Sequence, residues 1–146
     1  MLKREIKFRG KDIENEHKWR YGSLITYPNG ASVIVEFDND CNELSYDVDP
    51  NTVGQFVFMK DRNKNEIYEK DIVKQYFEVE TENSNTLSGY SIGVVRLTSQ
   101  GAIITPYKTY FDTGEEYRNK CTKLRFNRAE IVGNIFDNLE LYKKVQ

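Results

Sequence analysis

The sequence has little of what most catalytic and membrane-bound proteins depend on. It contains one histidine, two cysteines and three prolines among its 146 residues. It has no apolar run near the length of about 20 residues that a membrane-spanning helix needs. Its first residues are charged, unlike the apolar core of a secretion signal. We therefore expect a cytoplasmic protein with reduced thiols and no membrane partner.

The few reactive side chains are not arranged for catalysis or metal binding. His17 lies in a polar segment, and no further histidine or cysteine arrangement supports it as a general base. Cys41 and Cys121 have the spacing of neither a metal site nor a redox pair. From Asp38, the sixth position of a calcium loop would be Glu43, where glycine is required. Phosphate-binding glycine loops and Gly-flanked serine nucleophiles are also absent. The sequence predicts no enzyme, no metal site and no cofactor.

Charge is unevenly distributed although the formal net charge is only -2. Residues 36–49 hold six acidic side chains and no basic one, and residues 118–128 hold five basic side chains and no acidic one. Three interpretations stay open: solvated surface, a contact between subunits in which the two stretches meet, and a basic strip that binds a polyanion.

Apolar and polar side chains alternate along most of the chain, which predicts β-strands. Residues 19–27 and 31–37 form the clearest pair, because Pro28-Asn29-Gly30 between them suits a hairpin turn. Other predicted strands cover residues 5–9 (ended by Gly10), 53–59, 72–80, 90–97, 102–106, 123–126 and 131–136. Loops are expected at 38–49, 81–88 and 107–120, and a short amphipathic tail at 137–144.

Aromatic residues reach 13% of the chain and suggest binding surfaces as well as core. Trp19 and Tyr21 alternate in phase with Ile25, which favours the core. Exposed aromatics beside basic groups can stack the bases of a single strand. The candidate nucleic-acid-binding residues are Lys108, Arg118, Lys120, Lys123, Arg125, Arg128, Tyr107 and Tyr110. Aromatics in polar segments also suit a protein contact, including one with a second copy.

Four blocks of the sequence, in order, resemble the YopX family. They are residues 6–11 with 19–24, residues 49–56 running on to 66–73, residues 93–95, and residues 130–141. Two motifs make the match specific: Thr52-Val53-Gly54-Gln55-Phe56 and Val132-Gly133-Asn134-Ile135. Lys64 and Lys70 stand where glycine is common in the family, so each would place a side chain on a left-handed turn.

The resemblance implies a phage or prophage protein of no assigned activity, in the cytoplasm of its bacterial host. It also implies a domain similar to small Src-homology-3-like barrels. We expect one mainly-β domain over residues 1–146, with only short helical turns. An N-terminal antiparallel sheet (1–60) precedes a barrel-like region (67–136) and a tail (137–146). The expected role is non-enzymatic, through protein contacts that include homo-oligomer assembly. The alternative is nucleic-acid binding through the basic strip 118–128 and nearby aromatics.

Overall fold

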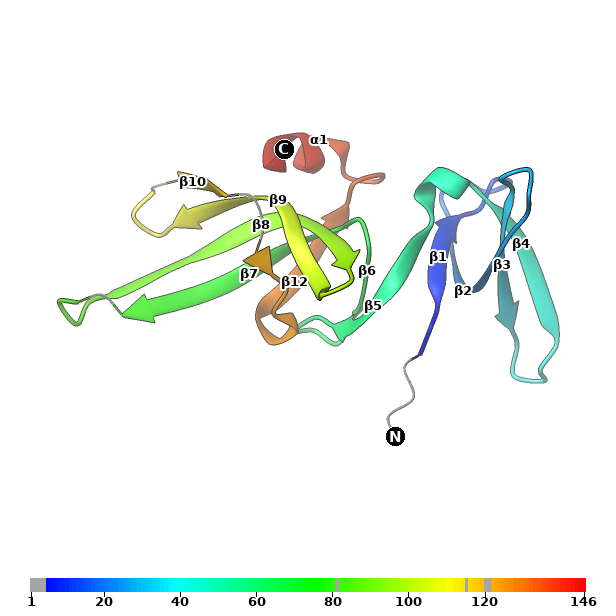
Figure 1. The fold of residues 1–146 in the computed structure, drawn as a ribbon, viewed down its shortest axis with the longest axis horizontal. Coiled ribbons are helices and arrows are strands. Elements are labelled where there is room, and N and C mark those ends of the chain that lie inside the picture. Colours follow the sequence, from blue (N-terminus) through cyan, green and yellow to red (C-terminus); the bar gives the residue numbers. More distant parts are fainter. Residues whose placement is uncertain (1–4, 81, 115, 120–121) are drawn as a thin grey trace. The chain divides into compact units, whose positions relative to one another are not determined.

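A computed structural model describes residues 5–80, 82–114, 116–119 and 122–146 (Figure 1). The chain is mainly β, as the alternation predicts, and its sheets are antiparallel. It divides into two compact units, a first unit of residues Met1–Phe58 and a second unit of residues Met59–Gln146.

The first unit is built on an antiparallel sheet with the strand order β4-β3-β2-β1-β5. The predicted hairpin is confirmed: the N–H of Tyr27 donates to the carbonyl of Ala31, and Gly30 has a φ of +88°. Its strands are β1 (Phe8–Lys11), β2 (Trp19–Thr26), β3 (Ser32–Phe37), β4 (Glu43–Val48) and β5 (Gly54–Lys60), with a 3-10 turn, η1 (Pro50–Thr52), before β5.

Two predicted element boundaries in the first unit are wrong. Gly10 does not end a strand but lies inside β1, where its lack of a side chain lets Val48 pack against it. The acidic stretch is not a loop beyond residue 42, because β4 pairs with β3 from Glu43 to Val48. Along β4 the larger side chains Leu44, Tyr46 and Val48 alternate with polar ones, a pattern that the many carboxylates obscure.

The second unit holds a sheet with the order β10-β9-β8-β7-β12, and β11 also pairs with β9. Among the described residues, β12 pairs only with β7, and β10 and β11 pair only with β9, so no closed barrel is found. The elements are β6 (Glu66–Tyr68), β7 (Asp71–Glu80), β8 (Thr86–Thr98), β9 (Gly101–Phe111), β10 (Glu116–Asn119), β11 (Thr122–Lys123), the 3-10 turn η2 (Phe126–Arg128), β12 (Ala129–Asn134) and helix α1 (Leu139–Val145). Helix α1 lies in the segment that the sequence predicts as an amphipathic tail.

The predicted loop 107–120 is largely strand, and the predicted loop 81–88 becomes strand at Thr86. β7 and β8 pair down to Glu80 and Thr86, so their hairpin reaches beyond β9 and β10 in the second unit (Figure 1). β9 continues to Phe111. Between the residues that pair with Gly93 and Val95 of β8, β9 carries one extra residue, which keeps the two strands paired on either side of it. A bulge accommodates Pro106, which cannot donate to the ladder. A Cβ on Gly93 would lie 2.4 Å from the carbonyl oxygen of Pro106, so the close approach requires glycine.

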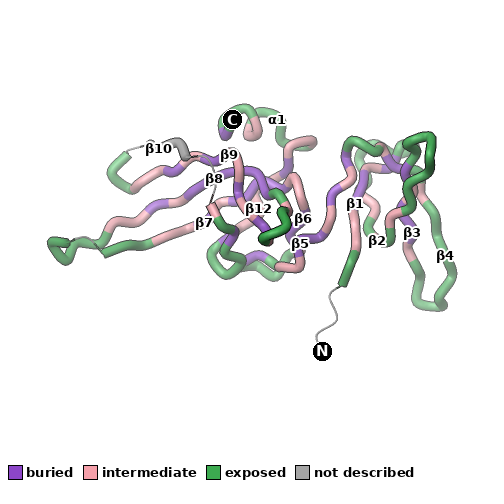
Figure 2. Tube along the Cα trace, viewed as in Figure 1, coloured by how far each residue is buried: buried purple, intermediate pink, exposed green. Residues whose placement is uncertain are grey.

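The core of the second unit lies on both faces of β8. Figure 2 shows the buried stretch of β8, which covers residues 91–95. On one face, Ile72, Ile92 and Val94 pack against Val145 of α1. A short helix can therefore cover one end of that face and leave the remainder open.

Candidate binding surfaces

The basic strip runs along the surface of the second unit where the structure describes it. Lys123 and Arg125 are exposed and flank the buried Leu124. The side-chain amide of Gln75 fixes this backbone: its Nε2 donates to the carbonyl of Lys123 at 3.2 Å, and its Oε1 accepts from the N–H of Arg125 at 2.6 Å. The two cations are therefore carried by an anchored segment.

Other residues predicted for the strip are placed differently. The predicted strand 123–126 does not reach its last residue, because Phe126 begins the turn η2 and is 53% exposed. Arg128 is also exposed. Arg118 lies in β10, where its backbone pairs with that of Lys108, and Lys120 lies outside the described residues.

Of the two tyrosines predicted to stack bases, only Tyr110 has an accessible ring. Tyr107 is 6% exposed and points into the core of the second unit. Tyr110 and Lys108 lie on the opposite face of β9, because residues two apart in a strand share a face.

Tyr110 is the last member of a tyrosine ladder, Tyr76, Tyr90 and Tyr110, that crosses β7, β8 and β9. Tyr76 is directly opposite Tyr90, and Tyr90 is directly opposite Tyr110. The ring centroids of the two pairs are 6.2 Å and 5.4 Å apart, with interplanar angles of 58° and 35°. All three rings are half-buried.

Cations lie against the ladder. The Nζ of Lys74 is 4.6 Å from the ring centroid of Tyr90, and the Cζ of Arg62 is 5.1 Å from that of Tyr76. The hydroxyl of Tyr76 donates to the Oε2 of Glu130 at 3.0 Å. Burial raises the pKa of Tyr76 above its usual value of 10.0, and the Glu130 carboxylate adds to the increase.

The face that carries the ladder is banded from α1 toward the tip of the β7–β8 hairpin. The first row is apolar and packs against α1, the second holds two lysines, the third is the ladder and the fourth is acidic. By register these rows are Ile72 and Val94; Lys74, Ile92 and Lys108; Tyr76, Tyr90 and Tyr110; and Glu78, Ser88 and Asp112. Arg128 joins Tyr76 and Tyr90 in lining a groove along the last two rows.

A second surface lies on the first unit. Ile6, Tyr21 and Phe37 line an open groove and are 66%, 45% and 63% exposed. Val35 forms its buried floor. Tyr21 and Ile25 are 45% and 42% exposed, so the alternation that favours the core does not describe this part of β2.

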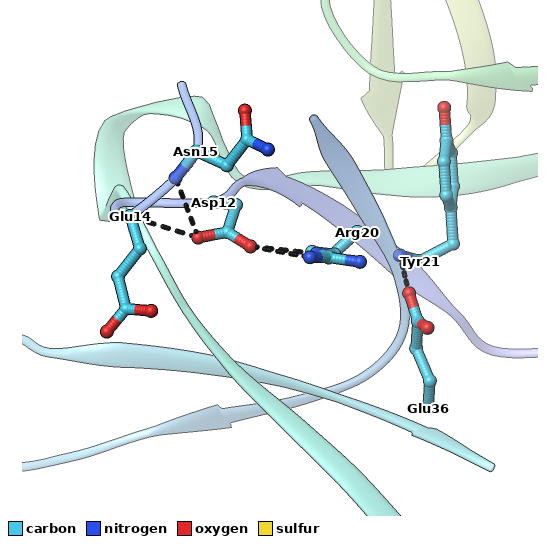
Figure 3. A network of polar contacts seen from close by, with 6 residues as sticks. All are labelled: Asp12, Glu14, Asn15, Arg20, Tyr21 and Glu36. Atoms are coloured by element: carbon cyan, nitrogen blue, oxygen red, sulfur yellow. Dashed lines mark hydrogen bonds and ion pairs between the residues drawn. The ribbon is translucent and has the colours of Figure 1, made fainter. Parts of the chain in front are cut away.

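The polar network of the first unit has a structural explanation (Figure 3). The Asp12 carboxylate accepts from the N–H groups of Glu14 and Asn15 and from the guanidinium of Arg20. Arg20 also stacks on Tyr46, with its Cζ 3.7 Å from the ring centroid. The hydrogen bond from Arg20 is the main cause that holds the pKa of Asp12 below its usual value of 3.8. The network fixes the turn that leads from β1 into β2.

Two kinds of feature are absent from the described residues. No group of three His, Cys, Asp or Glu side chains is placed to hold a metal ion. No helix in that part of the chain has the length and apolar character to cross a bilayer. His17 is exposed in the turn after β1.

The family model described as YopX protein matches residues 7–143, nearly the whole chain. The chain belongs to the YopX family. A comparison with curated proteins finds no match.

Several residues of the YopX-like blocks hold turns and bulges together. Gly133 lies at a bulge in β12, as its place inside a strand predicts. Asn134 accepts from the N–H groups of Phe136 and Asp137, a local backbone contact that the sequence also predicts. Lys64 and Lys70 do adopt the left-handed backbone, with φ of +67° and +72°. These roles are architectural.

The tyrosine ladder is the feature that sequence reasoning missed. Tyr76, Tyr90, Lys74 and Arg62 were not among the predicted site residues. The sequence carries one indication of this surface: the alternation that puts Lys74 and Tyr76 on the same face of a strand. The partners across the sheet depend on register, which the alternation does not reveal.

Proposed function

We propose that this YopX-family protein is a non-enzymatic phage or prophage accessory protein that acts by protein contact in the bacterial cytoplasm. One observation carries the proposal: Ile6, Tyr21 and Phe37 are gathered, largely exposed, around a single groove of the first unit. Grouped apolar side chains at a surface mark interaction sites, whereas isolated ones are ordinary. Aromatic residues are also enriched where proteins meet.

The partner proposed first is a second copy of this chain. A two-fold contact buries the same patch on both subunits, so the patch must be complementary to itself. The groove meets this condition, because its lining includes Lys7 together with Glu5 and Glu36. Lys7 already pairs with Glu5 at 3.1 Å. In a copy turned by 180°, Lys7 of one subunit can therefore lie opposite Glu5 or Glu36 of the other.

Light scattering after gel filtration tests this function with the full chain. We expect a dimer in the wild type at concentrations of about 10–100 μM, and a monomer in Phe37→Ser, which removes the most exposed aromatic ring of the groove. Val79→Ser is the matched control, because Val79 is an exposed apolar residue of the second unit. A wild type that stays monomeric, or a Val79→Ser variant that dissociates equally, would contradict the proposal.

We also propose that the second unit is an open relative of the small Src-homology-3-like barrels. Two features support this. The order β12-β7-β8-β9-β11 brings β12, the last strand of the chain, beside β7, the first strand of this sheet. The Gln75 side chain bridges from β7 to Lys123 at the end of β11 and to Arg125 just after it, on the other edge of this order.

A further inference from the structure

We propose that the open sheet face of the second unit binds single-stranded nucleic acid, with bases on the tyrosine ladder and phosphates over the lysine row. This site is separate from the groove of the first unit, and it does not depend on the proposed protein contact. It also differs from the basic strip 118–128, which is the site that charge alone indicates.

The aromatic rings have the arrangement that unpaired bases need. Proteins that bind single strands stack successive bases on aromatic side chains, and some do so on the face of a β-sheet. The three tyrosines stand on neighbouring strands at centroid spacings of 6.2 and 5.4 Å. Both spacings exceed the rise of about 3.4 Å per nucleotide in a duplex. Bases on successive rings would therefore be splayed apart, which a duplex does not allow.

The cations lie where a phosphate backbone would run. Lys74 and Lys108 occupy equivalent positions on either side of Ile92, in the row next to the tyrosines. Lys74 is in contact with the ring of Tyr90, and Arg62 with the ring of Tyr76. A strand laid along the ladder would thus meet positive charge along its length.

The acidic row gives the strand one orientation across the sheet. Glu78 and Asp112 lie on the hairpin-tip side of the ladder, where the hydroxyl of Ser88 bonds to Asp112. Phosphates on that side would face carboxylates, and like charges at close range repel. The phosphates therefore run on the lysine side, next to the row that α1 covers.

An acidic protein segment is the competing ligand, because it would also be attracted to the lysines. The ladder favours a nucleic acid, since every base offers a flat π-face to each ring whatever its sequence. An acidic peptide has no such group at each repeat. We therefore expect tight binding to an oligonucleotide and at least tenfold weaker binding to poly-glutamate of the same charge.

Fluorescence anisotropy with labelled 12-nucleotide dT and rU probes, and a duplex of the same length, tests the inference on the full chain. We expect both single strands to bind at least tenfold more tightly than the duplex at low salt. The logarithm of affinity should fall linearly with the logarithm of salt concentration, because phosphate contacts release counterions. Absence of binding at low salt, a duplex bound as tightly as the single strands, or poly-glutamate bound as tightly as they are would overturn the inference.

Matched variants locate the site. Lys74→Gln/Lys108→Gln should weaken oligonucleotide binding at least tenfold and lower the salt slope by about 1.4, the value for two single-strand phosphate contacts. Lys18→Gln/Lys60→Gln removes the same charge at two exposed positions and should change affinity less than twofold. If Lys123→Gln/Arg125→Gln weakens binding and the Lys74/Lys108 variant does not, the basic strip is the site and the ladder is not.

Stacking is tested separately from charge. Tyr76→Phe keeps the ring and should retain binding, whereas Tyr76→Leu should lose about fivefold or more. Thermal unfolding of both variants confirms that each is folded at the binding temperature. Equal affinities for the folded Phe and Leu variants would show that the ring does not stack a base, and would overturn the inference.

Discussion

Lys64 and Lys70 adopt backbone conformations that most turns reserve for glycine. A side chain in the left-handed region costs roughly 1–2 kcal/mol, because its Cβ approaches the following carbonyl. Lys70 has a compensating contact, since its Nζ lies 5.6 Å from the ring centroid of Phe136. Lys64 is exposed, and its N–H donates to the carbonyl of Asp61. The side chain of Lys64 therefore offsets less of the backbone strain than that of Lys70 does.

Replacing Lys64 by glycine should stabilise the protein. We expect Lys64→Gly to raise the free energy of unfolding by about 0.5–1 kcal/mol, which is the relieved strain less the greater entropy of glycine in the unfolded chain. Lys64→Ala removes the same charge but keeps a Cβ, so its stability should match the wild type. Urea unfolding measures both. A gain in both variants would trace the effect to charge and not to the backbone.

Asp12 should make the stability of the first unit depend on pH in acid. Its pKa is lowered in the folded state, chiefly by the hydrogen bond from Arg20. The stabilisation is therefore complete above the unfolded pKa near 3.8 and is lost as pH falls through the lower, folded pKa. Asp12→Asn should be less stable at pH 7 and lose less between pH 5 and pH 2.

Denaturant unfolding of wild type and Asp12→Asn across that pH range measures the effect. Asp40→Asn is the control, because Asp40 is exposed in the turn between β3 and β4. Parallel pH profiles for the wild type and Asp12→Asn would show that the Arg20 contact does not set the acid dependence.

At the scale of elements, Asp61 joins parts of the second unit that lie far apart in sequence. Its Oδ1 accepts from the N–H groups of Asn63 and Asn65, which closes the turn between β5 and β6. Its Oδ2 accepts from the N–H of Ile131 in β12, 70 residues later. The side chain is 4% exposed, so water cannot replace a lost contact.

Asp61→Asn should cost about 1–3 kcal/mol of stability, because its amide nitrogen must face at least one N–H donor that the carboxylate accepts from. Glu80→Gln removes the same charge at an exposed position at the end of β7 and should be neutral. Hydrogen exchange of the Ile131 amide gives a local readout, and we expect its protection to fall in Asp61→Asn alone. Unchanged protection would show that this contact does not hold β12.

How far the elements could be predicted depended on how clearly each alternates. The hairpin at Pro28-Asn29-Gly30 and the strand after Asp71 combine turn residues with clean alternation, so both were predictable. β4 was missed because carboxylates reduce the contrast between its faces. The second half of β9 was missed because the bulge near Pro106 shifts the phase of the pattern. A local phase shift cannot be recognised without the partner strand.

At the scale of the whole molecule, the sequence predicts binding through a set of residues that shares only Lys108 and Tyr110 with the rows of the face that carries the ladder. Charge along the chain singled out 118–128, because those cations lie close together in the sequence with no acidic residue between them. The cations of the ladder come from β7 and β9 and from the turn before β6, and only sheet register brings them together. The apolar groove was hidden for the opposite reason: Tyr21 alternates in phase with Ile25 as a core residue would, yet the two side chains are 45% and 42% exposed.

If both proposals hold, assembly and nucleic-acid binding should be linked by avidity alone. A dimer carries two ladders, and a strand long enough to reach both gains the effective concentration of the second site. Phe37→Ser should therefore leave the affinity for a 12-nucleotide probe unchanged and weaken binding to a probe of about 60 nucleotides at least tenfold. Val79→Ser should change neither. Equal weakening on both probes would place the groove in direct contact with the strand, whereas no weakening on the long probe would show that the two sites act on separate molecules.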